Sequence, residues 1–240
     1  MQKEIFGAED LLKLYQQVIR GEFIDRPNRF IARVRLGDTV EVCHVKNTGR
    51  CRELLLPGAA VTLAVSSRKE RKTRCDLVAV RKGNLLINLD SQAPNQAARE
   101  ALPRLFPGLS GIRPETVFGR SRLDFSAEWE GKTLFVEVKG VTLEDGGTAL
   151  FPDAPTERGT RHLHELEACV AAGCRAALLL VIQMKGVTQF RPNARTDPAF
   201  ARALRHARDA GVEILAYDCR VTEDSMTLDQ PVPVAWDEYF

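Results

Sequence analysis

Residues 120–141 read RSRLDFSAEWEGKTLFVEVKGV, and apolar and polar side chains alternate along two arms separated by Glu130 and Gly131. A period of two is typical of β-strands, and Gly can supply the positive φ that a two-residue hairpin loop needs. The stretch therefore predicts a β-hairpin in which Trp129 pairs with Lys132.

This register would place Asp124 opposite Glu137 and Arg122 opposite Lys139. Opposed side chains point the same way, with Cβ atoms roughly 4.5–5.5 Å apart, so the two carboxylates would repel unless a divalent cation lay between them. The alternative is a solvated strand face on which Arg122 and Lys139 separate a poorly paired acid couple. The opposite face would be apolar, with the pairs Leu123–Val138, Phe125–Val136 and Ala127–Leu134.

The composition is that of an ordinary globular chain of one large or two small domains. Of 240 residues, 44% are hydrophobic and 28% are charged. No run of 18 apolar residues predicts a transmembrane helix, and no signal-type apolar block opens the chain, so we expect a cytoplasmic protein without a membrane partner. The six cysteines form no C-x-x-C pair and are expected to be reduced and packed.

The net charge of +2 is unevenly distributed. Residues 28–82 hold 13 Lys/Arg and 5 Asp/Glu, a net charge of +8, whereas residues 111–240 hold 15 and 20, a net charge of −5. This asymmetry indicates that the N-terminal region meets a polyanion.

An N-terminal domain is expected over residues 1–90. Apolar spacing predicts a helix over 8–20 that Gly21 ends, followed by five strands at 30–36, 39–45, 60–65, 73–81 and 84–89 and a helical turn within 50–56. Five short strands suit an OB-like five-stranded β-barrel, a fold whose loops commonly bind nucleic acid. The candidate nucleic-acid-binding residues of this barrel are Arg29, Arg33, Lys46, Asn47, Arg50, Arg52, Arg71 and Lys72.

Residues 91–114 are expected to form a linker with a connecting helix over 95–105, and residues 115–240 a second domain. There the pattern predicts the hairpin, a helix over 157–172, a strand over 176–184, a helix capped by Asp197 and a strand over 212–217. Residues 221–240 should wrap the surface. The fold class is therefore α/β (α+β), with a mixed sheet flanked by helices. His162 and His164 are interpreted as surface histidines.

The main candidate catalytic and metal-binding residues lie on the hairpin. Mg²⁺ or Mn²⁺ prefers oxygen ligands, which the Asp124 and Glu137 carboxylates and the Val138 carbonyl can supply. Lys139 would orient a water molecule or stabilise charge on phosphoryl oxygens, and Glu115 lies nearby in sequence, on a preceding helix or turn. These groups suffice for phosphodiester hydrolysis.

An Asp, a hairpin turn and then Glu-Val-Lys resemble the PD-(D/E)xK nuclease core, with Leu123 where the motif has Pro. Further blocks resemble the sugar fermentation stimulation protein A (SfsA) family, although Lys46 stands where that family often has Pro. The blocks are RPNRF (26–30), HVKNTGR (44–50), RKT (71–73), SRLDF (121–125), VEVKGVTL (136–143) and FPDAPTERG (151–159).

The resemblance implies an OB-like domain followed by a PD-(D/E)xK nuclease-like domain in a bacterial DNA-binding protein linked to maltose use. It also implies a metal pair at Asp124 and Glu137 and a catalytic Lys139. Arg158 and Arg161 are candidates for holding a phosphate near a helix start, and Gln183 is a further candidate.

Two functions remain in contention. The first is a Mg²⁺- or Mn²⁺-dependent nuclease that binds DNA, with RNA as the alternative substrate. The second is a non-catalytic DNA-binding regulator of sugar (maltose) metabolism that uses an inactive nuclease fold. A glycoside hydrolase is disfavoured because the two acids sit beside a lysine without an aromatic sugar platform.

Overall fold

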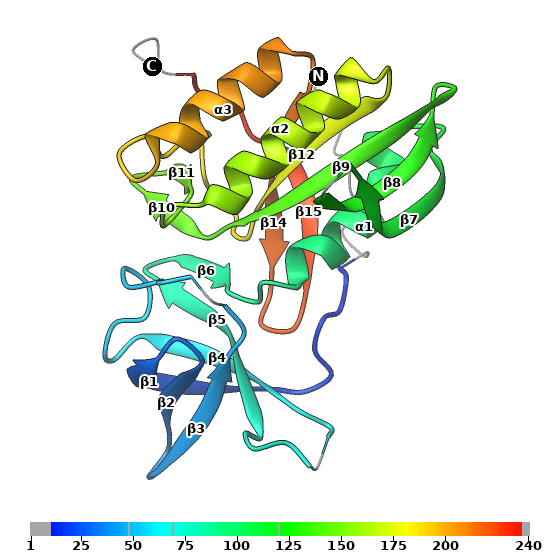
Figure 1. The fold of residues 1–240 in the computed structure, drawn as a ribbon. Coiled ribbons are helices and arrows are strands. Elements are labelled where there is room, and N and C mark those ends of the chain that lie inside the picture. Colours follow the sequence, from blue (N-terminus) through cyan, green and yellow to red (C-terminus); the bar gives the residue numbers. More distant parts are fainter. Residues whose placement is uncertain (1–10, 48, 69, 120, 237–240) are drawn as a thin grey trace.

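The computed structural model describes residues 11–47, 49–68, 70–119 and 121–236. These residues form a β-barrel and a second part in which helices cover both faces of a mixed sheet (Figure 1). The predicted fold class is confirmed. Within the described residues, no helix is long and apolar enough to cross a membrane.

The barrel is a closed ring of five strands. Pairing runs β2–β1–β4–β5–β3, and β3 returns to β2. The ring strands are β1 (Val18–Asn28), β2 (Ile31–Leu36), β3 (Thr39–Val45), β4 (Ala60–Val65) and β5 (Cys75–Lys82). The strand predicted at 84–89 is β6 (Leu85–Asn88), which extends the sheet beyond β5 and lies outside the ring.

The predicted helix over residues 8–20 is wrong over its described part. Residues 11–17 are not helical and β1 begins at Val18, while residues 8–10 lie outside the described residues. The β-branched pair Val18 and Ile19 favours a strand, and pairing with β4 decides the outcome. Gly21 ends no helix: it lies inside β1, where an added Cβ would collide with Val34.

The second part is built on one six-stranded mixed sheet, in the order β15-β14-β12-β9-β8-β7. Neighbours β9, β12 and β14 are parallel, and the others are antiparallel. The strands are β7 (Ser110–Phe118), β8 (Ser121–Trp129), β9 (Lys132–Val141), β12 (Arg175–Ile182), β14 (Glu213–Val221) and β15 (Met226–Pro231).

The predicted hairpin is confirmed as β8 and β9, with the Glu130–Gly131 loop at φ 50° and 73° and Trp129 paired with Lys132. The observed ladder ends at Phe125 and Val136, however, so the predicted pairs Asp124–Glu137 and Arg122–Lys139 are wrong. On their outer edges β8 pairs with β7 and β9 with β12, both alongside the hairpin ladder and beyond its end.

Helices cover both faces of the sheet. On one face lie α2 (Glu157–Ala171) and α3 (Pro198–Asp209), which pack on apolar side chains such as Phe135 and Leu178. On the other lies α1 (Ala93–Leu105), which packs against Phe125, Val136 and others. Leu123 packs with the α2 cluster and not with Phe125, so the hairpin face predicted to be apolar is split. Residues 91–114 thus contain α1 and the start of β7 and contribute to the second core.

Two further features were not predicted. A small sheet joins β10 (Leu143–Asp145), β11 (Thr148–Phe151) and β13 (Gln189–Pro192). The tail expected to wrap the surface instead provides β15, whose Met226 and Leu228 are fully buried; residues 237–240 lie outside the described chain. Leu12 and Leu14 hydrogen-bond to residues 224–227, so the segment that leads into the barrel crosses the end of the other part.

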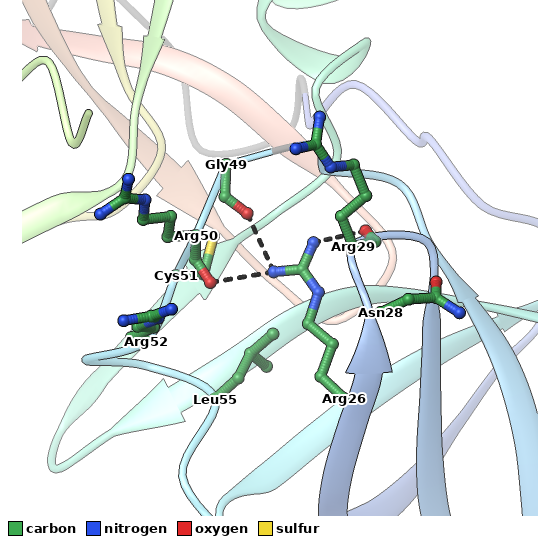
Figure 2. A pocket seen from close by; sticks show the side chains of 8 residues that line it. All are labelled: Arg26, Asn28, Arg29, Gly49, Arg50, Cys51, Arg52 and Leu55. Atoms are coloured by element: carbon green, nitrogen blue, oxygen red, sulfur yellow. Dashed lines mark hydrogen bonds between the residues drawn. The ribbon is translucent and has the colours of Figure 1, made fainter. Parts of the chain in front are cut away.

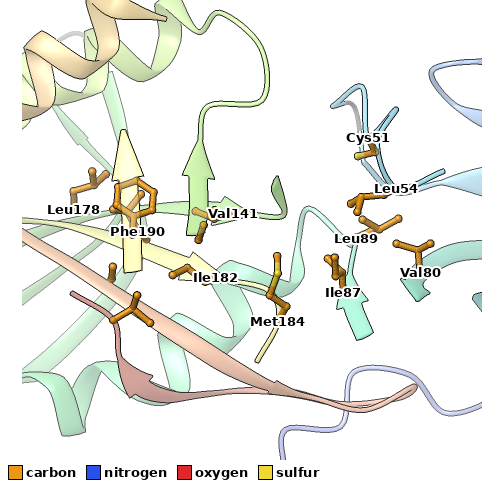
Figure 3. Packing of buried hydrophobic residues seen from close by; sticks show 14 of the residues in the cluster. Cys51, Leu54, Val80, Ile87, Leu89, Val141, Leu178, Ile182, Met184 and Phe190 are labelled. Carbon is orange, nitrogen blue, oxygen red and sulfur yellow. The ribbon is translucent and has the colours of Figure 1, made fainter. Parts of the chain in front are cut away.

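One hydrophobic cluster runs through both parts. Ile87 and Leu89 from the barrel side belong to the same cluster as Ile182 of β12, and Figure 3 shows Met184, which follows β12, lying between them. Beside them Gln183 is buried, and its Nε2 donates to the Asn88 carbonyl at 3.0 Å. The two parts are therefore joined by a shared core. All six cysteines are free and five are buried, which agrees with the predicted reduced state.

Candidate active site

The carboxylate of Asp124 lies where β8 and β9 separate. Its Oδ2 accepts the Val138 backbone N–H at 2.8 Å, and its Oδ1 accepts from Asn95 Nδ2, in the first turn of α1, at 2.8 Å. The side chain thus takes a backbone donor that the ladder no longer satisfies, and it sits directly beside the peptide that follows Glu137. Asp124 therefore lies close to β9 as predicted, but through a side-chain hydrogen bond to the Val138 N–H and not through strand pairing.

Glu137 and Lys139 share the face of β9 that α2 covers, because alternate strand residues point the same way. Lys139 Nζ donates to Glu137 Oε1 at 2.6 Å, and His162 Nδ1 contacts the same oxygen. Arg158 Nε donates to His162 Nε2 at 3.4 Å, so Nδ1 carries the ring proton and donates it to Glu137. Arg158 and His162 reach the site together because residues four apart lie on one helix face.

One oxygen of Glu137 is left over. Glu137 is 2% exposed, and its Oε2 is buried without a hydrogen-bond partner among the described residues. A buried carboxylate oxygen without a donor is costly unless something else binds it. The leftover oxygen of Glu137, two residues along β9 from Lys139, is therefore a buried acceptor with unused capacity.

The two carboxylates differ in electrostatics. Burial raises the pKa of Asp124, and the neighbouring Glu137 carboxylate raises it further, which outweighs the hydrogen bonds from Val138 and Asn95. Burial also raises the pKa of Glu137, but His162 and Lys139 outweigh it, so the pKa of Glu137 lies below its ordinary value. The pair repels at close range, which is the situation that a divalent cation reverses.

The predicted nucleic-acid-binding cations of the barrel fall into two groups. Some are held by acids on the protein: Arg33 by Asp25, Arg71 by Asp76 and Lys46 by Asp90. Arg29, Arg50, Arg52 and Lys72 are exposed. Asn47 is a loop residue whose Oδ1 accepts the Gly49 N–H at 2.7 Å. Exposed cations without an acid partner are the better candidates for contacting a polyanion.

Comparison with known proteins fits this two-part architecture. The model of the SfsA N-terminal OB domain matches residues 24–89, and that of the sugar fermentation stimulation protein RE domain matches residues 92–225. The chain belongs to the SfsA family. It is 54% identical over 213 residues to a sugar fermentation stimulation protein homolog of Desulfitobacterium hafniense, covering 88% of this chain and 93% of the relative. A Clostridium botulinum homolog is 47% identical over 228 residues, with 93% and 99% covered.

A solved structure of SfsA from Pyrococcus furiosus, in complex with Ca²⁺, matches this chain with a TM-score of 0.84 and 29% sequence identity. The match covers 94% of this chain and 99% of that one. The order of an OB barrel followed by a helix-flanked mixed sheet is thus that of SfsA, as the sequence resemblance implied.

Not every predicted site residue of this SfsA family member lies at the buried site. Glu115 lies within β7, not on a helix or turn, and its exposed carboxylate is 3.0 Å from Arg122. Arg161 is exposed on α2. Gln183 binds the barrel and not the carboxylates. Asp124, Glu137, Val138, Lys139 and Arg158 are brought together.

Two residues of this SfsA site were missed by sequence reasoning. The prediction of a surface histidine is wrong for His162, which is 3% exposed, and holds for His164. The position of His162 beside Leu163 and Leu166 on the buried side of α2 was the available signal. For Asn95 the sequence contains no such signal, because only the packing of α1 brings this residue to Asp124.

His162 is expected to position Glu137. Replacing it with Ala removes a hydrogen-bond donor to a candidate metal ligand, a change that typically costs about 10–100-fold in metal affinity or activity. We expect the Mn²⁺ concentration for half-maximal thermal stabilisation to rise by about this factor. His164→Ala, two residues along the same helix and exposed, is the matched control; equal effects of the two substitutions would contradict the assignment.

Proposed function

We propose that this protein is a divalent-metal-dependent nuclease that hydrolyses phosphodiester bonds in DNA. The observation that carries the proposal is the Glu137 carboxylate, with one oxygen held by Lys139 and His162 and the other buried without a donor among the described residues. The carboxylates of Asp124 and Glu137 and the amine of Lys139 fit phosphodiester hydrolysis better than a structural role.

The residues present fit a hard divalent cation. Glu137 Oε2 offers an unused lone pair, each Asp124 oxygen accepts one recorded hydrogen bond and keeps further acceptor capacity, and the Val138 carbonyl is the third predicted ligand. Mg²⁺ or Mn²⁺ commonly takes one or two carboxylates and completes its shell with water and phosphate oxygens. The Ca²⁺ complex of SfsA from Pyrococcus furiosus adds support, since Ca²⁺ also prefers oxygen ligands.

When bound, such a cation supplies Lewis-acid stabilisation and eases deprotonation of water. The chain's own groups supply orientation and charge. Lys139 has three donors and spends one on Glu137, so the others can hold a phosphoryl oxygen or the attacking water. In the proposed step the water oxygen forms a bond to phosphorus as the P–O bond to the leaving strand breaks; one water proton ends on the leaving oxygen to give an alcohol, and the other is released to solvent as the phosphate monoester forms.

Lys139 gives the most direct test. Purified protein is incubated with labelled single-stranded DNA, duplex DNA and RNA in Mn²⁺, and Lys139→Met is expected to slow cleavage by on the order of 10²–10³-fold because it removes a donor aimed at developing charge. Lys132→Met, exposed on the same strand, is the control. Absence of cleavage on every substrate, or wild-type cleavage by Lys139→Met, rules out the proposed activity.

A non-catalytic DNA-binding protein is the second candidate. One observation favours this candidate. In the described part of the chain, no three His, Cys, Asp or Glu residues are grouped so that they could hold a metal ion. This candidate predicts that DNA binding is unchanged by a chelator and that no DNA is cut. Regulation of sugar (maltose) metabolism would then be the role that the family resemblance suggests.

A further inference from the structure

The barrel carries a pocket of about 350 Å³ that lies apart from the carboxylate site. Its lining comes from the end of β1, the β1–β2 turn and the loop after β3. Figure 2 shows the Arg26 guanidinium between these segments, while the side chains of Arg29, Arg50 and Arg52 start beside it and extend outward in different directions. Four guanidinium groups around one pocket of ligand-binding size form a strongly positive site.

Arg26 has a different task from the other three arginines. Its guanidinium donates to the carbonyls of Asn47 (2.7 Å), Gly49 (2.9 Å) and Arg50 (2.9 Å) in one loop and of Arg29 (2.5 Å) in the other. One planar fork of donors thus fixes both loops relative to each other. Arg26 is therefore a positioning residue that sets where the other guanidinium groups lie.

The loop after β3 is also fixed by its surroundings. The Arg50 N–H donates to Asp153 Oδ2 at 3.2 Å, and an added Cβ at Gly49 would lie 2.7 Å from the same oxygen. Asp153 belongs to the second part of the molecule, just before α2. The pocket is thus preorganised, and it is tied to the element that carries Arg158 and His162.

The remaining arginines of the pocket differ from the paired arginines elsewhere on the barrel. In the ranges that the structure describes, the guanidinium groups of Arg29, Arg50 and Arg52 form no ion pair, whereas Arg33 and Arg71 on the same barrel are neutralised by acids. Three cations that line one pocket without a neighbouring acid favour the binding of an anion there. A phosphate group, with its acceptor oxygens and negative charge, matches guanidinium donors in both geometry and charge.

A smaller pocket of about 120 Å³ lies at the junction of the two parts. Its lining includes Asn47 at the start of the arginine loop, Asp153, which accepts the Arg50 N–H, and Gly140, which directly follows Lys139. At Gly140 an added Cβ would lie 2.7 Å from Pro94 Cγ and would collide with Gln183, so these two side chains pack directly on the backbone there.

We propose that the arginine pocket binds one backbone phosphate of the nucleic acid whose scissile phosphodiester lies at Asp124 and Glu137. Only the placement of the scissile phosphodiester at Asp124 and Glu137 rests on the proposed nuclease function. The pocket itself holds phosphate without a metal ion, and Arg26 shapes it while Arg29, Arg50 and Arg52 contact the phosphate.

The test measures binding in EDTA, where the carboxylate site holds no cation. Fluorescence anisotropy with a labelled single strand and the matched duplex, over a salt series, is compared for wild type and the double variant Arg50→Gln/Arg52→Gln. We expect affinity to fall about 10-fold or more and the salt slope to fall by roughly 0.7 per lost contact for a single strand or 0.9 for a duplex. Arg33→Gln, which removes a paired charge on the same barrel, should change both quantities little.

Arg26→Lys keeps the charge but cannot make four carbonyl contacts, so it should weaken binding as the double variant does while leaving circular dichroism unchanged. Hydrolysis of the small diester bis(p-nitrophenyl) phosphate in Mn²⁺ needs only the carboxylate site and should be equal in wild type and the double variant. If the double variant bound DNA with the affinity and salt slope of the wild type, the proposal that the arginine pocket binds a phosphate would be wrong. Lost binding without cleavage by any form would instead refute the nuclease and leave the pocket standing.

Discussion

Replacing Glu137 with Gln is expected to lower Mn²⁺-dependent DNA cleavage by on the order of 10³-fold or more, since the proposed mechanism loses a charged metal ligand. The amide keeps the size of the side chain, so the fold should persist. It removes the negative charge and replaces one acceptor with an NH₂ group, which cannot accept from Lys139 and His162 or bind a cation. Initial rates of cleavage of a labelled oligonucleotide measure the effect.

A second readout separates metal binding from catalysis. A cation that binds only the folded protein stabilises it by about 2.7 kcal/mol at 100 times its dissociation constant, which raises Tm by about 5–10 °C at 2–4 °C per kcal/mol. Glu137→Gln should lose this Mn²⁺-dependent rise. Glu128→Gln, exposed on the neighbouring strand, should retain both the rise and the activity. A full Mn²⁺ shift in Glu137→Gln would show that the cation binds elsewhere.

Replacing Met184 with Ala is expected to lower the free energy of unfolding by about 2–5 kcal/mol, the range for truncating a fully buried side chain of this size. Met184 is 0% exposed and lies where the barrel meets the sheet. Because one cluster spans both parts, we expect them to unfold together. Denaturant unfolding followed by tryptophan fluorescence and by far-UV circular dichroism measures the loss.

The two probes report on different regions. Trp129 and Trp236 both lie outside the barrel, whereas circular dichroism sees the strands of both parts. Coincident curves in the wild-type protein are the expected result. Met226→Ala, an equally buried Met in the cluster under α1, is the matched control and should lower stability while the curves stay coincident. Separate transitions in the wild type would contradict a shared core.

Local patterns predicted the elements whose signals are contained in a few residues. The hairpin loop at Gly131 needs positive φ, and the Asp197 cap accepts the Phe200 N–H as expected. The apolar run that became β12 is buried on both faces, as a central parallel strand should be. Asp124, Glu137 and Lys139 were found because the hairpin brings distant residues together through a short loop.

The missed features depend on contacts between distant segments. Residues 11–20 carry apolar side chains at helical spacing, but closing the barrel required Val18 to pair with β4. The β8–β9 ladder ends at Phe125 and Val136, and the Val138 N–H is bound instead by the Asp124 side chain, which no local pattern encodes. His162 was misplaced because the burial of one face of α2 depends on the sheet beneath it.

The crossing of residues 11–17 over the strand-turn at 224–227 has a consequence for synthesis. A ribosome adds about 5–20 residues per second, so the first segment emerges roughly 10–40 s before its hydrogen-bond partners exist. The barrel can therefore form before residues 11–17 have their hydrogen-bond partners. Synthesis of residues 224–227 then allows the segment that precedes β1 to bind.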